Sequence, residues 1–168
     1  MGVKWTTKKN ELPKMHLNVK NLNGRKVQIG PKGEQAWLAG IHEYGCIITV
    51  TPAMRAFLHR KGLHLKESTT VIKIPERSFL RNGHDECVNE VMKQIERATE
   101  LVIAGKMSED ELLSWAGEQF AEEIKEYIVK LSSPPLHPFT VEQKGSSNPL
   151  VNAGGGGGIV SSIQWKKV

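Results

Sequence analysis

Histidines are the residues of this 168-residue chain best suited to metal binding, and there are six of them. His59 and His64 are five residues apart and bracket Gly62, while His42 is followed directly by Glu43. A zinc site usually shows a tighter pattern, such as HExxH or histidines combined with paired cysteines, and the sequence contains neither. We therefore expect ordinary surface or core histidines and no metal.

A run of five glycines, 154–158, is the feature that most resembles a phosphate-binding loop. A P-loop needs Lys and Ser or Thr directly after its last glycine, whereas Ile159 and Val160 follow here. The dinucleotide pattern GxGxxG cannot be placed in the run either. Cys46 and Cys87 stand in no nucleophile motif, so we expect two buried thiols. The sequence thus predicts a protein that is not an enzyme and binds no cofactor.

The charge of the chain is unevenly distributed around a net value of +5. Residues 1–33 contain eight basic residues and one acidic residue, and residues 108–131 contain seven acidic and two basic residues. A basic segment and an acidic helix on one chain can bind nucleic acid, or can bind each other between copies. No apolar stretch approaches the roughly 20 residues that span a bilayer, and no signal peptide is recognisable.

Two long helices are the strongest secondary-structure prediction. Apolar residues recur at helical spacing over 85–104 and again over 108–131. Ser108 and Glu111 have the spacing of a capping box, and the short link of Lys106 and Met107 predicts an αα-hairpin.

Shorter elements surround these helices in the sequence. Strands are predicted at 26–29, 46–51, 68–74 and 159–168, with short helices from 34 to about Tyr44 and from Pro52 to Gly62. Residues 132–149 read as a loop. The pattern predicts an α+β fold, in which a small, mainly antiparallel sheet packs against the helix hairpin. We expect a basic N-terminal arm over 1–25 and one domain over 26–168.

Five segments occur in an order that is specific. They are 41–45 (IHEYG), 74–81 (IPERSFLR), 134–140 (PPLHPFT), 148–154 (NPLVNAG) and 161–165 (SSIQW). This set resembles the neck or tail-completion (virion morphogenesis) family of tailed bacteriophages, from about Lys26 to the C-terminus. The family usually has Thr where Ala153 stands, and the run 155–158 replaces a further step of its pattern.

The resemblance implies a structural protein of the virion neck or tail. It would form a homo-oligomeric ring, with six-fold symmetry expected, that joins the tail to the head–tail connector. Its partners would be the connector and the tail terminator or tail tube proteins. Genomic DNA would pass through the lumen without sequence readout, no membrane would be involved, and the host cytoplasm would be the place of assembly.

Roles for individual residues follow from these motifs. Phe79 and Leu80 are expected to anchor the core, and Asn82 or Asp85 to cap the following helix. The candidates for contacts between subunits are Arg77, Arg81, His42, Glu43 and Trp165. Arg77 and Arg81 are expected on the rim, where arginine suits a neighbour's carboxylate, although Arg77 is equally suited to an ion pair within its own chain.

The C-terminal segment leaves two alternatives open. Ile159, Ile163 and Trp165 alternate like a strand, but Ser161 interrupts the apolar face. In one alternative, Gly154, Gly155, Gly156, Gly157 and Gly158 form a hinge and the strand settles only against a neighbour in the ring. In the other, the strand is already docked in the single subunit.

A basic, non-sequence-specific nucleic-acid-binding protein is the alternative function. It would use the 1–33 segment together with Arg55, Arg60, Lys61 and Lys66. Its affinity for DNA would fall steeply with salt concentration.

Overall fold

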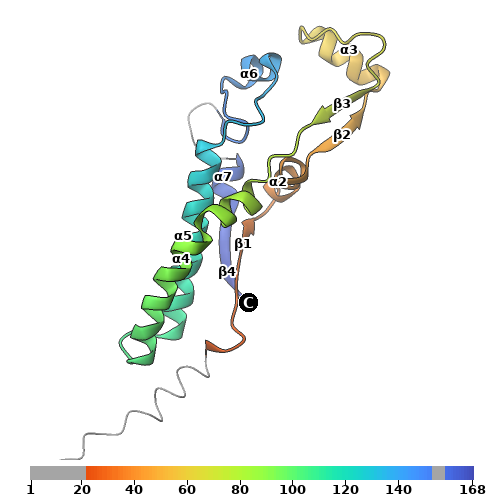
Figure 1. The fold of residues 1–168 in the computed structure, drawn as a ribbon. Coiled ribbons are helices and arrows are strands. Elements are labelled where there is room, and N and C mark those ends of the chain that lie inside the picture. The colour runs from red at the N-terminus through yellow and green to blue at the C-terminus, as the bar shows by residue number, and fades with distance from the viewer. Residues whose placement is uncertain (1–21, 153–157) are drawn as a thin grey trace, which may run out of the picture.

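A pair of long helices, α4 (Phe79–Ile103) and α5 (Glu109–Lys130), dominates the structure and packs along its length (Figure 1). The computed structural model describes residues 22–152 and 158–168. The side chain of Ser108 accepts a hydrogen bond from the Glu111 backbone, and the Glu111 side chain accepts one from the Ser108 backbone. The predicted capping box is therefore confirmed. Three acidic residues in the first turn of α5 also favour the positive end of the helix dipole.

The four strands form two separate antiparallel pairs. Strand β1 (Val27–Pro31) pairs with β4 (Ile163–Lys167), so that Val27 lies opposite Lys167, and this pair packs against α5. Strand β2 (Cys46–Thr49) pairs with β3 (Val71–Ile74), with Cys46 opposite Ile74. The predicted α+β class and helix hairpin are confirmed, with the strands divided between two small sheets.

The second sheet carries a helical tip away from the rest of the molecule. Helix α2 (Gln35–Tyr44) packs near β1 and leads into β2, and α3 (Pro52–Arg60) follows at the far end of the strands. Figure 1 shows β2, α3 and β3 extending from α2, with α3 remote from the α4–α5 hairpin. We call residues 46–74 the arm.

The core lies where α2, α4 and α5 meet the C-terminal segments. Phe79 has no exposed surface there, and Leu80 packs against the same cluster. The other buried members are Ala39, Ala121, Ile124, Ile128, Leu150, Val151, Ile159 and Ile163.

Several elements differ from the sequence prediction. Helix α4 begins at Phe79, six residues before the expected start, and neither Asn82 nor Asp85 is its N-cap. A further helix, α6 (Pro138–Lys144), lies in the segment expected to be a loop. Proline at its first position and the left-handed Gly145 after it are the usual punctuation of a helix, so the signal was present.

The C-terminal strand is shorter than expected and belongs to the single subunit. Helix α7 (Gly158–Ser162) occupies the first half of the expected strand, which explains why Ser161 broke the alternation. Ile159 and Ile163 are buried in the core, and β4 is hydrogen-bonded to β1 of the same chain. Of the two alternatives left open by the sequence, the structure thus shows the one in which the strand is docked in the single subunit. Two further predictions concern residues outside the described ranges. They are the hinge at glycines 154–157 and most of the basic N-terminal segment, residues 1–21.

Candidate assembly surface

Glu43 is a buried carboxylate that ends up at the N-terminus of a helix 36 residues further along the chain, since α4 begins at Phe79. One of its oxygens, Oε2, accepts a hydrogen bond from the Leu80 backbone at 2.9 Å, and Oε1 accepts one from the Arg81 backbone at 3.2 Å. Ser78 occupies the N-cap position but provides no capping bond through its side chain. Glu43 therefore caps α4, and its negative charge interacts favourably with the positive end of the helix dipole.

Arg81 completes the pairing with Glu43. Its Nε atom lies 2.9 Å from Glu43 Oε1, and its Nη2 atom lies 2.7 Å from an oxygen of Glu76. The hydrogen bonds of Ser78 and Arg81 lower the pKa of the Glu76 carboxyl. The guanidinium also lies over the Tyr44 ring, 5.0 Å from its centre. Although half of the Arg81 side chain is exposed, its charge is already matched within the subunit.

Arg77 does not lie on the rim, so that prediction is wrong. It is 4% exposed, and its guanidinium donates to the carbonyl oxygens of Pro134, Pro135 and Pro75. No ion pair is formed by Arg77 among the residues that the structure describes. Arg77 thus ties the segment before α4 to the proline pair after α5, and it is not available to a neighbouring subunit.

His42 sits beside this arrangement and is kept neutral by it. Its carbonyl oxygen accepts a hydrogen bond from the Arg77 backbone at 2.7 Å. Its Nδ1 atom is buried and has no hydrogen-bond partner among the described residues. Burial, followed by the charges of Arg77 and Lys144, lowers the pKa of His42 to about 4. A neutral, inward-facing imidazole of this kind contributes packing rather than a charged contact.

Gly45 allows the end of α2 to approach the segment between β3 and α4. Its backbone has a φ of 70° and a ψ of 171°, a region that only glycine adopts readily. A Cβ atom at this position would lie 2.8 Å from both the Glu76 nitrogen and the Ile74 carbonyl oxygen. We call His42, Glu43, Gly45, Arg77 and Arg81 the polar joint.

The segment 148–151 and the lysine before it, Lys144, are held by a similar internal network. The Asn148 side chain donates to the carbonyl oxygens of Ile128 and Val129 at the end of α5, and accepts from the Leu150 and Val151 backbone. Lys144 donates to the carbonyl oxygens of Asn148 and Pro149, and burial is the main reason that its pKa is lowered. These polar groups fix the course of the chain after α5.

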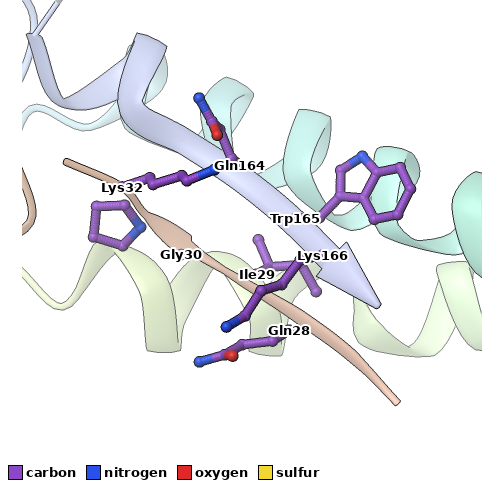
Figure 2. A pocket seen from close by; sticks show the side chains of 8 residues that line it. Gln28, Ile29, Gly30, Lys32, Gln164, Trp165 and Lys166 are labelled. Carbon is purple, nitrogen blue, oxygen red and sulfur yellow. The ribbon is translucent and has the colours of Figure 1, made fainter. Parts of the chain in front are cut away.

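Trp165 has a mixed position. A Cβ atom on Gly117 of α5 would lie 2.5 Å from its ring, so the indole packs directly on the backbone of that helix. Figure 2 shows the Trp165 side chain leaving β4 on the α5 side, away from Gln28 and Lys166. The ring is only partly covered, and it lines two surface hollows.

The arm contrasts with these networks because it has no core. Within residues 46–74, all of which the structure describes, no residue is buried. The β2–β3 register places Ile47, Thr49, Val71 and Lys73 on one exposed face. A two-stranded hairpin without a packed face is marginally stable in water, so this surface is suited to contact with another chain.

An apolar stripe leads from α2 into the arm. Trp37, Tyr44 and Ile47 are 76%, 70% and 68% exposed. Trp37 and Tyr44 are seven residues apart, two turns along one face of α2, and their spacing in the sequence would have revealed the stripe. Exposed apolar surface of this kind typically marks a protein–protein contact. We call these three residues the apolar stripe.

The tip of the arm is basic and is ordered by hydrogen bonds. The guanidinium of Arg55 donates to the carbonyl oxygens of Leu65, Lys66 and Thr69, and the Thr51 side chain caps α3 through the Met54 backbone. Arg55 is therefore committed to holding the loop after α3, and it is not the free nucleic-acid contact that was expected. Arg60, Lys61 and Lys66 remain exposed.

The hollow along the first sheet is lined by polar and apolar residues in equal number. It measures about 210 Å³, and Gly30 leaves space at its centre between Lys32, Gln164, Gln28 and Lys166 (Figure 2). Among the lining residues there is no carboxylate, thiol or histidine. The hollow shows no grouping suited to acid–base or nucleophilic chemistry.

Metal and membrane features were sought across residues 22–152 and 158–168. No group of three or more His, Cys, Asp or Glu side chains there is arranged to hold a metal ion. None of the helices in these ranges is long and apolar enough to cross a bilayer. Cys87 is buried, which raises the pKa of its thiol, whereas Cys46 is only partly buried, contrary to the expectation of two buried thiols.

The function of this chain has to be inferred from its sequence and geometry, because comparisons with known proteins found no match. No family model, curated protein or solved structure matches the chain.

Proposed function

We propose that this protein is a structural component of the neck or tail of a tailed bacteriophage. Identical subunits form a closed ring, with six-fold symmetry expected, that completes the tail and joins it to the head–tail connector. DNA passes through the lumen without being read. The proposal combines the five ordered sequence motifs with a subunit whose arm has no buried core of its own.

The observation that carries the proposal is the absence of any buried residue in the arm, residues 46–74. The strands expose Ile47 and Val71, and the helical tip exposes Phe57. These side chains are covered when the arm contacts another subunit, and the exposed apolar area then contributes to association.

The distribution of charge supports a contact between unlike surfaces. The arm carries five basic residues and one acidic residue, whereas α5 carries seven acidic and two basic residues. Figure 1 places the tip of the arm and the α4–α5 hairpin in separate parts of the molecule. A contact between two different surfaces is heterologous, and repeated heterologous contacts generate a ring when the rotation closes.

Sedimentation velocity of the full chain over a range of concentrations, alone and with purified tail tubes, tests this function. We expect a discrete ring-sized species, visible as a symmetric ring by electron microscopy. Replacing Trp37 and Ile47 with Ser should shift the equilibrium to monomer, while Val129→Ser, at another exposed apolar site, should not. A chain that remains monomeric under all these conditions would overturn the proposal.

The basic nucleic-acid-binding protein remains the second candidate, and the exposed Arg60, Lys61 and Lys66 favour it. It predicts DNA binding by the monomer with a steep salt dependence. Finding the chain only as a DNA-bound monomer outside virions would support this second function and contradict the first.

A further inference from the structure

We propose that α3 of one subunit docks into the groove between α5 and β4 of the next copy of this chain. The occupant is the tip face of α3, formed by Phe57, Arg60 and Lys61. The groove is defined by Glu118, Glu122 and Trp165 of the neighbour. This assignment rests on the proposed ring, and it names the two surfaces that meet in it.

The tip face is amphipathic and uncovered. Phe57 and Arg60 are spaced i and i+3 on one side of α3, and Lys61 follows Arg60 as the C-cap residue. The Phe57 side chain is 50% exposed, and none of the nine residues of α3 is buried. The bonds of Arg55 hold the tip in shape before any contact is made. A preorganised surface loses little conformational entropy on binding.

The groove combines apolar surface with a net negative charge, since two glutamates and one lysine, Lys125, line it. It measures about 260 Å³, and Ala121, Ile163 and Trp165 provide its apolar lining. Glu118 and Glu122 line the same groove one helical turn apart on α5, and both are exposed. A ring such as that of Phe57 suits the apolar part, while the two carboxylates suit the cations beside it.

One carboxylate of the groove is already paired and the other is not. Lys125 Nζ lies 2.7 Å from Glu122 Oε1. Glu118 has no ion pair within 4 Å among the described residues of its own chain. The central charge contact is therefore Arg60 to Glu118, and the partly exposed Trp165 ring is close enough to the groove to pack on an arginine.

The groove of the same subunit is not available to its own tip. The arm leads away from α2, and α3 stands at its far end, apart from α5 and β4 (Figure 1). Joining the two surfaces requires a second copy, whose own tip is then free for a third. Each subunit contributes one tip and one groove, which is the arrangement that a closed ring of identical subunits needs.

Charge reversal with rescue tests the contact. The full chain is compared by sedimentation velocity with Arg60→Glu, Glu118→Arg and the double variant carrying both. Each single variant should weaken association by about tenfold or more, and the double variant should recover to within about threefold of the unaltered chain. Glu96→Arg makes the same charge change on α4 outside the groove, and it should associate normally.

The outcomes separate this contact from the ring itself. If the unaltered chain forms rings and the single variants do so equally well, the docking is wrong while the proposed function stands. If the unaltered chain never associates, the proposed function fails with it. A DNA-binding measurement on the same variants covers the other occupant. Loss of DNA affinity on Arg60→Glu, with no effect of Glu118→Arg and no rescue, would assign the tip to DNA and overturn the docking.

Discussion

The polar joint and the arm are neighbours in the sequence but follow opposite rules. In the joint, Glu43 and Arg77 are 2% and 4% exposed, and their charged groups have hydrogen-bond partners inside the subunit. In the arm, no residue of 46–74 is buried, and Arg60 and Phe57 face outward. The charged groups of the joint have their partners within one subunit, whereas the apolar side chains of the arm stay exposed unless another chain covers them.

This difference shows where the most recognisable motifs act. The segments 41–45, 74–81 and 134–140 meet at the joint, where Glu43 caps α4 and Arg77 holds the proline pair. Their residue types are explained by the stability of one subunit. Apart from Tyr44 of the apolar stripe, the surfaces proposed for assembly therefore lie outside these three motifs, in the arm and in the groove beside Trp165.

The largest expected effect is a difference in stability between alanine variants of Phe79 and Phe57. Phe79→Ala should lower the free energy of unfolding by about 3–5 kcal/mol, because the side chain is fully buried in the core. Phe57→Ala, on the arm, should cost less than about 1 kcal/mol in the monomer. Urea unfolding of both variants measures this, and an equal loss for Phe57→Ala would show that the arm has a core of its own.

The next effect concerns the carboxylate of the joint. Glu43→Ala should destabilise the subunit by about 2–4 kcal/mol, because it removes the acceptor of two backbone N–H groups of α4 and one of the two carboxylate partners of Arg81. Glu43→Gln keeps one acceptor oxygen and should cost less. Glu76→Ala removes the exposed partner of the same arginine and should change stability far less than Glu43→Ala, because water screens an exposed ion pair. A similar loss for both alanine variants would contradict the capping role of Glu43.

Two helical glycines should respond with opposite signs. Gly117→Ala should destabilise by about 1–3 kcal/mol, since a Cβ atom there overlaps the Trp165 ring. Gly40→Ala has open space around it and should stabilise α2 by about 0.5–1 kcal/mol. Thermal melts of the two variants give the signs. Stabilisation by Gly117→Ala would mean that Trp165 is not seated on α5.

The last effect is a dependence of stability on pH. The pKa of His42 is about 4 in the folded chain and near 6.5 when unfolded, so the unfolded state takes up the proton first as the pH falls. The contribution of His42 is fully present above about pH 6.5 and is lost by about pH 4. In His42→Gln, the decline between these values should be shallower than in the unaltered chain. A slope for His42→Gln identical to that of the unaltered chain would contradict the partly buried, neutral imidazole.

Local signals in the sequence were enough to predict the helix hairpin and most of the short elements. The capping box at Ser108 and the proline that opens α3 act through residues three or fewer positions away, so the sequence shows them directly. The same is true of the exposed apolar stripe, whose spacing on α2 was visible but not used. Helix α6 was missed although Pro138 and Gly145 mark its ends.

The sequence by itself determined the α+β class, the helix hairpin and the uneven charge, because each depends on neighbouring residues or on composition. Only the tertiary structure decided that α4 begins at Phe79, that Arg77 is internal and that the strands divide into two sheets. Each of these outcomes depends on a partner distant in the chain: the Glu43 carboxylate, the Pro134 and Pro135 carbonyl oxygens, and the pairing of β1 with β4. Contacts across such separations leave no periodic pattern, since their energy comes from groups that meet only after the chain has folded.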